Sequence, residues 1–209
     1  MPEISAALVK QLRDKTGAGM MDCKKALEEA NGDLAEAEVV LRKKGIAAAA
    51  KRQSRAARQG AIGCYIHPGS QLGVMVEVNC ETDFVARTDG FQELVHDIAM
   101  QIAAADPKYL RREEVPAAVL DKEREIARDR ARAEGKPEKV LEKIVEGRLA
   151  KYYEEACLMD QPFIKDNTLT VDQMIRANIS KMQENIAVAR FTRFKVGEAA
   201  AQQAEEAQA

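Results

Sequence analysis

The sequence contains few of the side chains that support covalent or redox catalysis. Its 209 residues include only two histidines and four cysteines. No cysteine lies in a CxxC motif, and neither His67 nor His96 has a neighbour that completes a recognisable pair of nucleophile and base. A glycine-rich phosphate-binding loop is also missing. We therefore expect no catalytic residue, no metal site and no bound cofactor, and we expect free, mostly buried thiols.

Long apolar runs are missing as well. No run approaches the roughly 20 residues that cross a bilayer, and Met1-Pro2-Glu3 lacks the basic-then-apolar pattern of a signal peptide. Hydrophobic residues make up 46% of the chain, which is enough to build real cores. These features predict a cytoplasmic globular protein with no membrane partner.

The chain also lacks an excess of positive charge. It has 32 basic and 34 acidic residues and a formal charge of -2, so a protein partner is favoured over a nucleic acid. The local exception is the basic segment Lys51–Arg58, which could touch RNA or an acidic protein surface. Because no aromatic residue lies within it to stack on bases, we expect a solvated linker or helix face instead.

Residues 1–45 have the apolar spacing of three short helices. Thr16-Gly17-Ala18-Gly19 ends the first helix, Asn31-Gly32 ends the second, and Asp33 with Glu36 resembles a capping box for the third. The apolar faces are supplied by Ile4, Leu8, Val9, Leu12, Met20, Cys23, Leu27, Val40 and Leu41. This pattern predicts a compact bundle of marginal size, the kind of module that binds a partner through a small apolar patch.

The corner Gly19-Met20-Met21 is the candidate patch. Two adjacent methionines cannot both point into one helical face, so at least one of them should be exposed, and methionine adapts well to contact surfaces. The alternative, that Met20 packs inside and Met21 lies at the rim without a role, stays open from the residues alone.

Residues 46–60 are alanine-rich and basic, and we expect a linker there, followed by a core domain over 61–197 and a flexible tail over 198–209. Alternation predicts a β-hairpin with strands over 62–66 and 74–80. A third strand is expected from Ile186 to Val196, with Ile186, Val188, Arg190, Thr192, Phe194 and Val196 on one face. The result should be an antiparallel three-stranded sheet.

Helices are expected between these strands. An apolar stripe from Phe91 to Ile102 should cover one face of the sheet. Residues 116–134 and 138–153 should form a helical hairpin, because Gly135-Lys136-Pro137 separates two amphipathic segments. Its expected seam is Leu120, Ile126, Leu141, Ile144, Val145 and Leu149. Together with the N-terminal bundle, this predicts an α+β fold.

The stretch Thr82-Asp83-Phe84-Val85 follows the second strand. Thr82 and Asp83 are good N-cap residues, so a plain strand-to-helix cap explains them without a partner. In that case Phe84 could be a core residue. The other interpretation is a probe in which an exposed phenylalanine enters a partner.

Two long stretches are distinctive: Leu12–Leu27, which reads LRDKTGAGMMDCKKAL, and Asn79–Arg87, which reads NCETDFVAR. Both resemble signature stretches of the translation elongation factor Ts family. The resemblance continues through Gln161–Asp166 and Glu184–Phe191 and reaches about Gly197. It implies a ubiquitin-associated-like N-terminal domain and an exchange factor that releases GDP from elongation factor Tu without a covalent step.

The resemblance also implies site residues. Asp83 and Phe84 would intrude near the partner's magnesium and phosphate site, with Thr82 and Val85 as supports. The N-terminal contacts would be Val9, Leu12, Arg13, Met20 and Met21. The partner would carry the Mg2+ and the GDP or GTP, and this chain would hold neither.

Only one sheet unit is present, whereas longer members of the family have a duplicated core. The resemblance therefore implies a homodimer in a two-plus-two complex, and the apolar alternation of 186–196 offers a face for pairing. A plain binding adaptor is the main competing function, with an RNA-binding factor and a thiol enzyme behind it.

Overall fold

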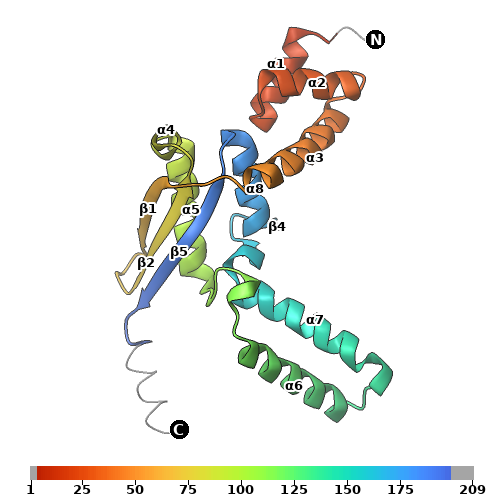
Figure 1. The fold of residues 1–209 in the computed structure, drawn as a ribbon, viewed down its shortest axis with the longest axis vertical. Helices are drawn as coiled ribbons and strands as arrows, with labels where there is room; N and C mark the ends of the chain where they lie inside the picture. Colours follow the sequence, from red (N-terminus) through yellow and green to blue (C-terminus); the bar gives the residue numbers. More distant parts are fainter. Residues whose placement is uncertain (1–3, 199–209) are drawn as a thin grey trace. The chain divides into compact units, whose positions relative to one another are not determined.

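The structure is a computed structural model, and it describes residues 4–198. It combines helices with an antiparallel three-stranded sheet of order β1-β2-β5 (Figure 1). The predicted α+β class and the predicted sheet are confirmed. The expected flexible tail lies outside the described residues from position 199 onward.

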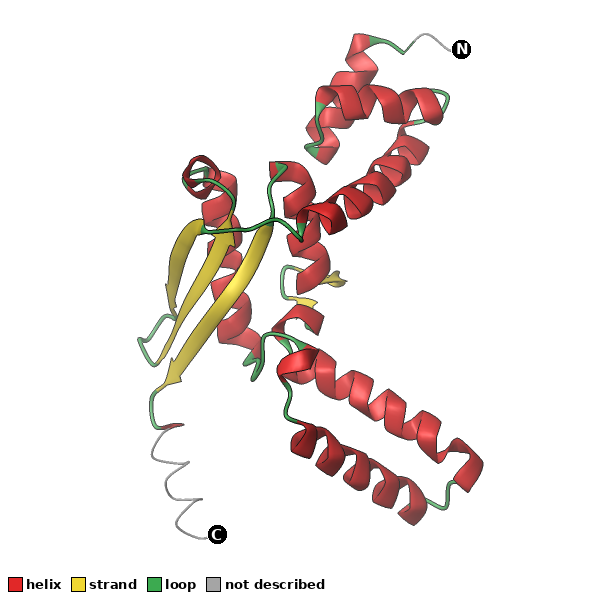
Figure 2. Cartoon of the chain, in the orientation of Figure 1, coloured by secondary structure: helices red, strands yellow, loops and turns green. Residues whose placement is uncertain are grey.

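Figure 2 distinguishes the helices from the strands of the chain. The α-helices within residues 4–198 are α1 (Ala6–Thr16), α2 (Met20–Glu29), α3 (Leu34–Arg52), α4 (Asp83–Ala86), α5 (Asp89–Ala105), α6 (Ala117–Ala133), α7 (Glu138–Ala156) and α8 (Val171–Met182). The strands are β1 (Gln59–Ile66), β2 (Leu72–Cys80), β3 (Pro162–Phe163), β4 (Asp166–Thr170) and β5 (Ile186–Lys195). Two 3-10 turns, η1 (Arg112–Glu114) and η2 (Leu158–Asp160), complete the set.

Local side chains define the N-terminal helices. Ser5 caps α1, Gly17 ends it with a φ of 67°, and the carboxylate of Asp33 accepts from the backbone N–H of Glu36 at 2.9 Å to start α3. The three helices share a buried cluster made by Val9, Leu12, Cys23, Ala26, Leu27, Ala30 and Ala37. The helices were predicted correctly, while the ubiquitin-associated-like character of the domain stays a prediction.

Helix α3 does not stop at Gly45 but continues to Arg52. The first part of the expected linker is therefore helical, and the stretch without regular structure before β1 is short. A side chain at Gly45 would come within 2.8 Å of the hydroxyl of Ser180 on α8, so glycine permits α3 to approach α8 closely. The domain boundaries at 45 and 60 stay predictions.

The sheet has one buried and one exposed face. Val74, Val76 and Val78 are buried, whereas Ile62 and Met75 on the opposite face are exposed. Helix α5 covers the buried face, and its stripe Phe91, Leu94, Val95, Ile98 and Ile102 is buried as predicted. Where α5 passes β1, a side chain at Gly63 would collide with Val95.

The expected alternation of β5 holds only over its first half. Ile186 and Val188 are buried, but Arg190 is exposed and forms an ion pair at 2.8 Å with Glu77 on the outer face of β2. The next partly buried positions are Phe191 and Arg193. The in-out alternation therefore shifts by one residue between Val188 and Phe191, so the prediction of a single regular face was wrong.

The helical hairpin α6–α7 is present, but its seam differs from the prediction. Leu141 and Val145 of α7 are buried as expected, and the buried residues of α6 are the small Ala127 and Ala131. Ile126 was expected in the seam and is instead exposed. Small side chains such as these two alanines allow helices to approach closely.

Two buried glutamine amides join α5, the end of α7 and the segment around β3. Gln101 and Gln161 are almost fully buried, and the Gln101 amide donates to the side-chain oxygen of Gln161 at 3.1 Å. Gln101 also accepts from the N–H of Ile164 at 2.8 Å, and Gln161 donates to the carbonyl of Glu155 at 2.9 Å. The short β3–β4 pair is fixed in this way.

The chain divides into two compact units. The first contains residues 1–61, 78–92 and 173–187, and the second contains 62–77, 93–172 and 188–209. The first unit thus holds α1–α4 and α8 from Gln173 onward, while the second holds the α6–α7 hairpin.

Two glycines give opposite predictions for stability. At Gly60, with a φ of 148°, a methyl group would collide with the carbonyl of Val78, so Gly60→Ala should lower the free energy of unfolding by about 2 to 4 kcal/mol. Gly147 lies within α7 with open space around it, so Gly147→Ala should raise that free energy by up to about 1 kcal/mol. Urea unfolding measures both; equal stability of the two variants would contradict this account of Gly60.

Candidate functional site

The loop after β2 presents Phe84 to solvent. The hydroxyl of Thr82 accepts from the N–H of Val85 at 3.3 Å and caps the single-turn helix α4. Phe84 follows on this turn and is 81% exposed. The capping interpretation is therefore correct for Thr82, and the alternative that Phe84 is a core residue is wrong.

Charges flank the exposed ring. Asp83 forms an ion pair with Arg87 one turn later, at 3.0 Å, and both side chains remain substantially exposed. Such a surface pair contributes little to stability. Asp83 is thus accessible to solvent beside Phe84, and Val85 is half-buried below it.

A carboxylate more than one hundred residues away holds this loop. One oxygen of Glu184 accepts from the backbone N–H groups of Glu81, at 3.1 Å, and Thr82, at 3.0 Å. Its other oxygen accepts from the hydroxyl of Thr82 at 2.6 Å. Glu184 lies in a family-like stretch of the sequence but was not predicted as a site residue, because its partners cannot be found from spacing.

The N-terminal corner is a second exposed apolar feature. Met20 and Met21 are 59% and 64% exposed at the start of α2, so both of them lie at the surface. Arg13 is also exposed. Val9 and Leu12 are buried in the helical core, where they support the corner from below.

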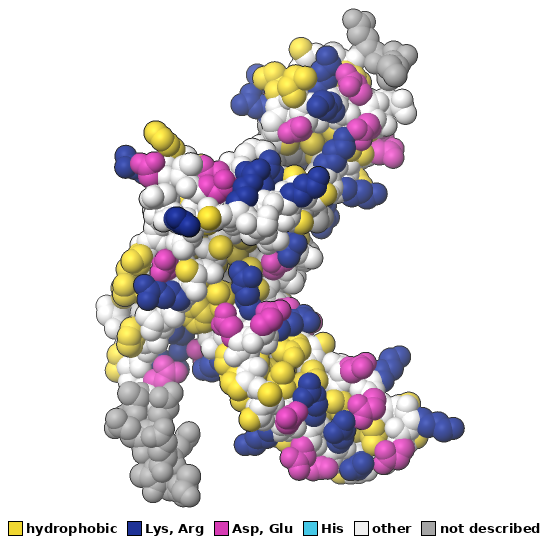
Figure 3. Space-filling view, in the orientation of Figure 1, with side chains coloured by type: hydrophobic (Ala, Val, Ile, Leu, Met, Phe, Trp, Pro, Cys, Tyr) yellow, Lys and Arg dark blue, Asp and Glu magenta, His cyan; other side chains and the backbone are white. Residues whose placement is uncertain are grey.

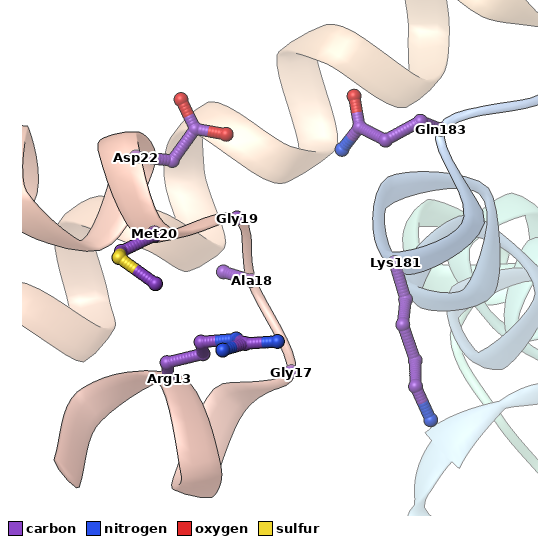
Figure 4. A pocket seen from close by; sticks show the side chains of 8 residues that line it. All are labelled: Arg13, Gly17, Ala18, Gly19, Met20, Asp22, Lys181 and Gln183. Carbon is purple, nitrogen blue, oxygen red and sulfur yellow. The ribbon is translucent and has the colours of Figure 1, made fainter. Parts of the chain in front are cut away.

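A hollow of about 440 Å³ adjoins this corner (Figure 4). Arg13, Met20 and Asp22 line it from the N-terminal helices, and Lys181 and Gln183 line it from the end of α8. The loop Gly17-Ala18-Gly19 completes the lining. Lys181 and Gln183 were not predicted as site residues, since their proximity depends on the packing of α8.

Both exposed features belong to the first unit. The corner lies within residues 1–61, and the Phe84 loop lies within 78–92. The end of α8, which contributes to the hollow and precedes Glu184, lies within 173–187. The residues that the resemblance implies as partner contacts are therefore brought together in one compact part of the chain.

The cysteines differ in their exposure. Cys64 is exposed, whereas Cys23, Cys80 and Cys157 are buried. Burial, with a smaller effect from Asp160, raises the pKa of the Cys157 thiol to about 11. Burial and the nearby Glu184 carboxylate also raise the pKa of Cys80, whose thiol donates to the carbonyl of Thr82 at 3.1 Å. A raised pKa disfavours the thiolate, so neither Cys80 nor Cys157 is an activated nucleophile.

Both histidines lie beside Tyr65. Nδ1 of His67 lies 3.0 Å from the hydroxyl of Tyr65, and the ring of Tyr65 packs edge-on against His96. Within residues 4–198, no three or more His, Cys, Asp or Glu side chains are grouped to hold a metal ion. Over the same range, no helix has both the length and the apolar character needed to cross a bilayer.

The basic segment is partly neutralised by its neighbours. Arg52 donates to the side chain of Gln183, and Arg55 forms an ion pair with Glu81 at 3.4 Å. Arg52, at the end of α3, thus contacts the residue that follows α8, and Arg55 contacts the start of the Phe84 loop.

The outer face of the sheet carries a group of exposed apolar side chains. Hydrophobic side chains gather over the strands in Figure 3. A shallow hollow of about 450 Å³ lies among Cys64, Ile66, Met75, Phe194 and Val196. The last two residues are 68% and 70% exposed, and a contiguous apolar surface of this kind is typical of a protein contact.

Comparison with known proteins gives one family. A family model described as Elongation factor TS matches residues 10–198. The match includes all of the candidate contact residues except Val9, which lies just before it.

Curated relatives with the same name match along nearly the whole chain. The protein named Elongation factor Ts from Solibacter usitatus (strain Ellin6076) is 68% identical over 199 residues, covering 95% of this chain and 94% of the relative. The one from Koribacter versatilis (strain Ellin345) is 61% identical over 195 residues, covering 93% and 89%. The one from Carboxydothermus hydrogenoformans is 56% identical over 203 residues, covering 97% and 94%.

The exposure of Phe84 predicts how its truncation affects folding. Phe84→Ala should change the free energy of unfolding by less than about 0.5 kcal/mol, because the ring makes few contacts in the folded chain. The matched control Phe91→Ala removes a fully buried ring from α5 and should cost about 3 to 5 kcal/mol. Urea unfolding followed by circular dichroism measures both, and a large loss for Phe84→Ala would place that ring in the core.

Proposed function

The chain belongs to the elongation factor Ts family, and we propose that it acts as a guanine nucleotide exchange factor in translation elongation. In this proposal it binds elongation factor Tu–GDP and promotes the release of GDP so that GTP can replace it. The observation that carries the proposal is Phe84, a large apolar side chain held in solvent by a capped and hydrogen-bonded loop.

We infer that the Phe84 loop enters the partner near its magnesium and phosphate site. Mg2+ requires near-ideal octahedral oxygen ligands and bridges phosphate to protein, so a small displacement of its ligands weakens the hold on GDP. An inserted aromatic ring supplies such a displacement and buries its own apolar area at the same time. Asp83 would act beside it on the local hydrogen bonds or field, with Thr82 and Val85 as supports.

Exchange of this kind requires no covalent step. A protein that lowers the partner's affinity for GDP must itself bind less tightly when GDP is present, and this reciprocity lets the cycle turn over. We propose that the partner carries the Mg2+ and the nucleotide, and that this chain holds no cofactor.

The N-terminal corner is the proposed second contact with elongation factor Tu. Its exposed residues are Arg13, Met20 and Met21, and flexible methionine side chains fit an apolar partner surface well. Val9 and Leu12 would act indirectly, since they are buried beneath this surface.

We further propose that two copies of the chain pair through the outer face of the sheet, giving a two-plus-two complex with elongation factor Tu. The exposed apolar residues on β1, β2 and β5 support this, because a homodimer interface buries apolar surface of this kind. No nucleic-acid or membrane contact is part of the proposal, and its setting is the cytoplasm.

The exchange activity can be tested directly. The purified chain is added to elongation factor Tu loaded with a fluorescent GDP analogue, and release is followed in excess unlabelled GDP. Wild type should accelerate release catalytically, and Phe84→Ala should lose about tenfold or more of that acceleration, as expected for a central aromatic contact. Ile126→Ala, which truncates an exposed apolar residue on α6, is the control and should behave as wild type.

The outcomes separate function from mechanism. No acceleration by folded wild type would reject the exchange-factor proposal and favour a binding adaptor. Equal acceleration by wild type and Phe84→Ala would keep the function and remove Phe84 from its mechanism.

The dimer is tested by a charge on the sheet face. Phe194→Asp should convert a dimer to a monomer in analytical ultracentrifugation, because a carboxylate in an apolar interface is costly to desolvate, while Ile126→Asp should leave the dimer intact. The Cys64 thiol should react slowly with a maleimide in the dimer and rapidly in the Phe194→Asp variant. A monomeric wild type at high concentration would contradict the proposal.

A further inference from the structure

The link between the Phe84 loop and the start of β5 is reciprocal. Glu184 accepts from the backbone N–H groups of Glu81 and Thr82, as described above. In return, the side chain of Glu81 accepts from the backbone N–H of Asn185 at 2.6 Å. The pair Glu81-Thr82 and the pair Glu184-Asn185 therefore each supply a carboxylate that accepts from the backbone N–H groups of the other pair.

Asn185 extends the link to the segment that follows α3. Its side chain is buried, and its amide donates to the carbonyl of Arg55 at 2.6 Å and, more weakly, to that of Gln53 at 3.4 Å. The Arg55 side chain returns to Glu81 as an ion pair. The Phe84 loop, the start of β5 and the end of the N-terminal helices are thus joined by one set of polar contacts within the first unit.

Glu184 controls the orientation of the loop through Thr82. The Thr82 hydroxyl donates to Glu184 at 2.6 Å and simultaneously accepts from the N–H of Val85 at 3.3 Å. The hydrogen bond to Glu184 therefore orients the Thr82 hydroxyl, and this hydroxyl caps the turn that carries Phe84. Hydrogen bonds to a carboxylate are stronger than those between neutral groups, and here three of them converge on one side chain.

We propose that Glu184 is a positioning residue for Phe84, which it holds in the exposed orientation that enters the partner. This inference rests on the proposed function of Phe84 in nucleotide release. Phe84 itself makes few contacts within the chain, so its direction is fixed by the turn below it, and that turn is fixed by Glu184 through Thr82. Preorganisation of this kind lowers the entropy that is lost when the ring enters a partner.

The test compares Glu184→Ala with Glu184→Gln. Alanine leaves two backbone N–H groups and the Thr82 hydroxyl without their acceptor, so exchange should slow by about tenfold or more. Glutamine has nearly the same shape: its oxygen can accept from both N–H groups and its NH2 can donate to the Thr82 hydroxyl, which then acts as acceptor. Glu184→Gln should therefore retain most of the activity.

A double-mutant cycle separates positioning from a general loss of structure. If Glu184 acts through Phe84, adding Glu184→Ala to Phe84→Ala should cause little further loss of exchange, because the ring that it positions is already absent. Adding Glu184→Ala to Met21→Ala should instead multiply the two losses, since Met21 lies at the separate N-terminal corner. Multiplicative losses in both pairs would overturn the proposal.

The role of Glu184 can also be measured on the free chain, through the protection of the backbone amides that it binds. Hydrogen exchange of the Glu81 and Thr82 amides, followed by NMR, should be slow in wild type and in Glu184→Gln, and about tenfold faster or more in Glu184→Ala. Unchanged amide protection in a folded Glu184→Ala variant would reject the positioning role of Glu184. If wild type failed to accelerate GDP release while the amides behaved as expected, the proposed function would fail, and the hydrogen bonds of Glu184 to the loop would remain as a structural feature alone.

If Glu184→Ala does not fold, Thr82→Val provides the second variant. Valine has the shape of threonine, but its side chain can neither donate to Glu184 nor cap α4, so Thr82→Val should slow exchange while leaving the Glu81 amide protected. Wild-type exchange by Thr82→Val would contradict the path from Glu184 through Thr82 to Phe84.

Discussion

The arrangement of the candidate site depends on one carboxylate that binds a distant loop. The order β1-β2-β5 puts the end of β2 beside the beginning of β5, so Glu184 can reach the backbone of Glu81 and Thr82. The backbone N–H groups just beyond the end of β2 have no partner within the sheet. An unpaired N–H group costs free energy when it is partly buried, so an acceptor is needed there. Because Glu184 supplies the acceptors, the chain can form a tight turn there and keep Phe84 out of its own core.

Much of the fold could be predicted because it is encoded by local patterns. Alternating apolar residues predicted the β-hairpin, the 3.6-residue spacing predicted α5, and cap residues such as Asp33 and Thr82 marked where helices begin. The exposure of Met20 and Met21 followed in part from simple geometry, since neighbours on a helix face different directions. These features depend on residues within a few positions of one another.

The features that were missed depend on long-range packing. The shift of alternation in β5, the alanine seam of α6 and the buried pair Gln101 and Gln161 each require knowledge of what lies opposite. Burial of a polar amide is favourable only when its partners are already in place, so no spacing rule identifies it. The same reason explains why Glu184, Lys181 and Gln183 were absent from the predicted site.

The membership of the first unit bears on how an exchange factor would work. Loosening a GTPase around GDP requires one contact that holds the partner and another that disturbs the site, and the two must act together. Here the N-terminal corner and the Phe84 loop belong to one compact unit. Within it, Asn185 donates a hydrogen bond to the segment after α3, and Glu184 accepts hydrogen bonds from the loop. Under the proposed function, binding energy gained at the corner would be applied at Phe84, because a contact that is already oriented loses less entropy than one on a free segment.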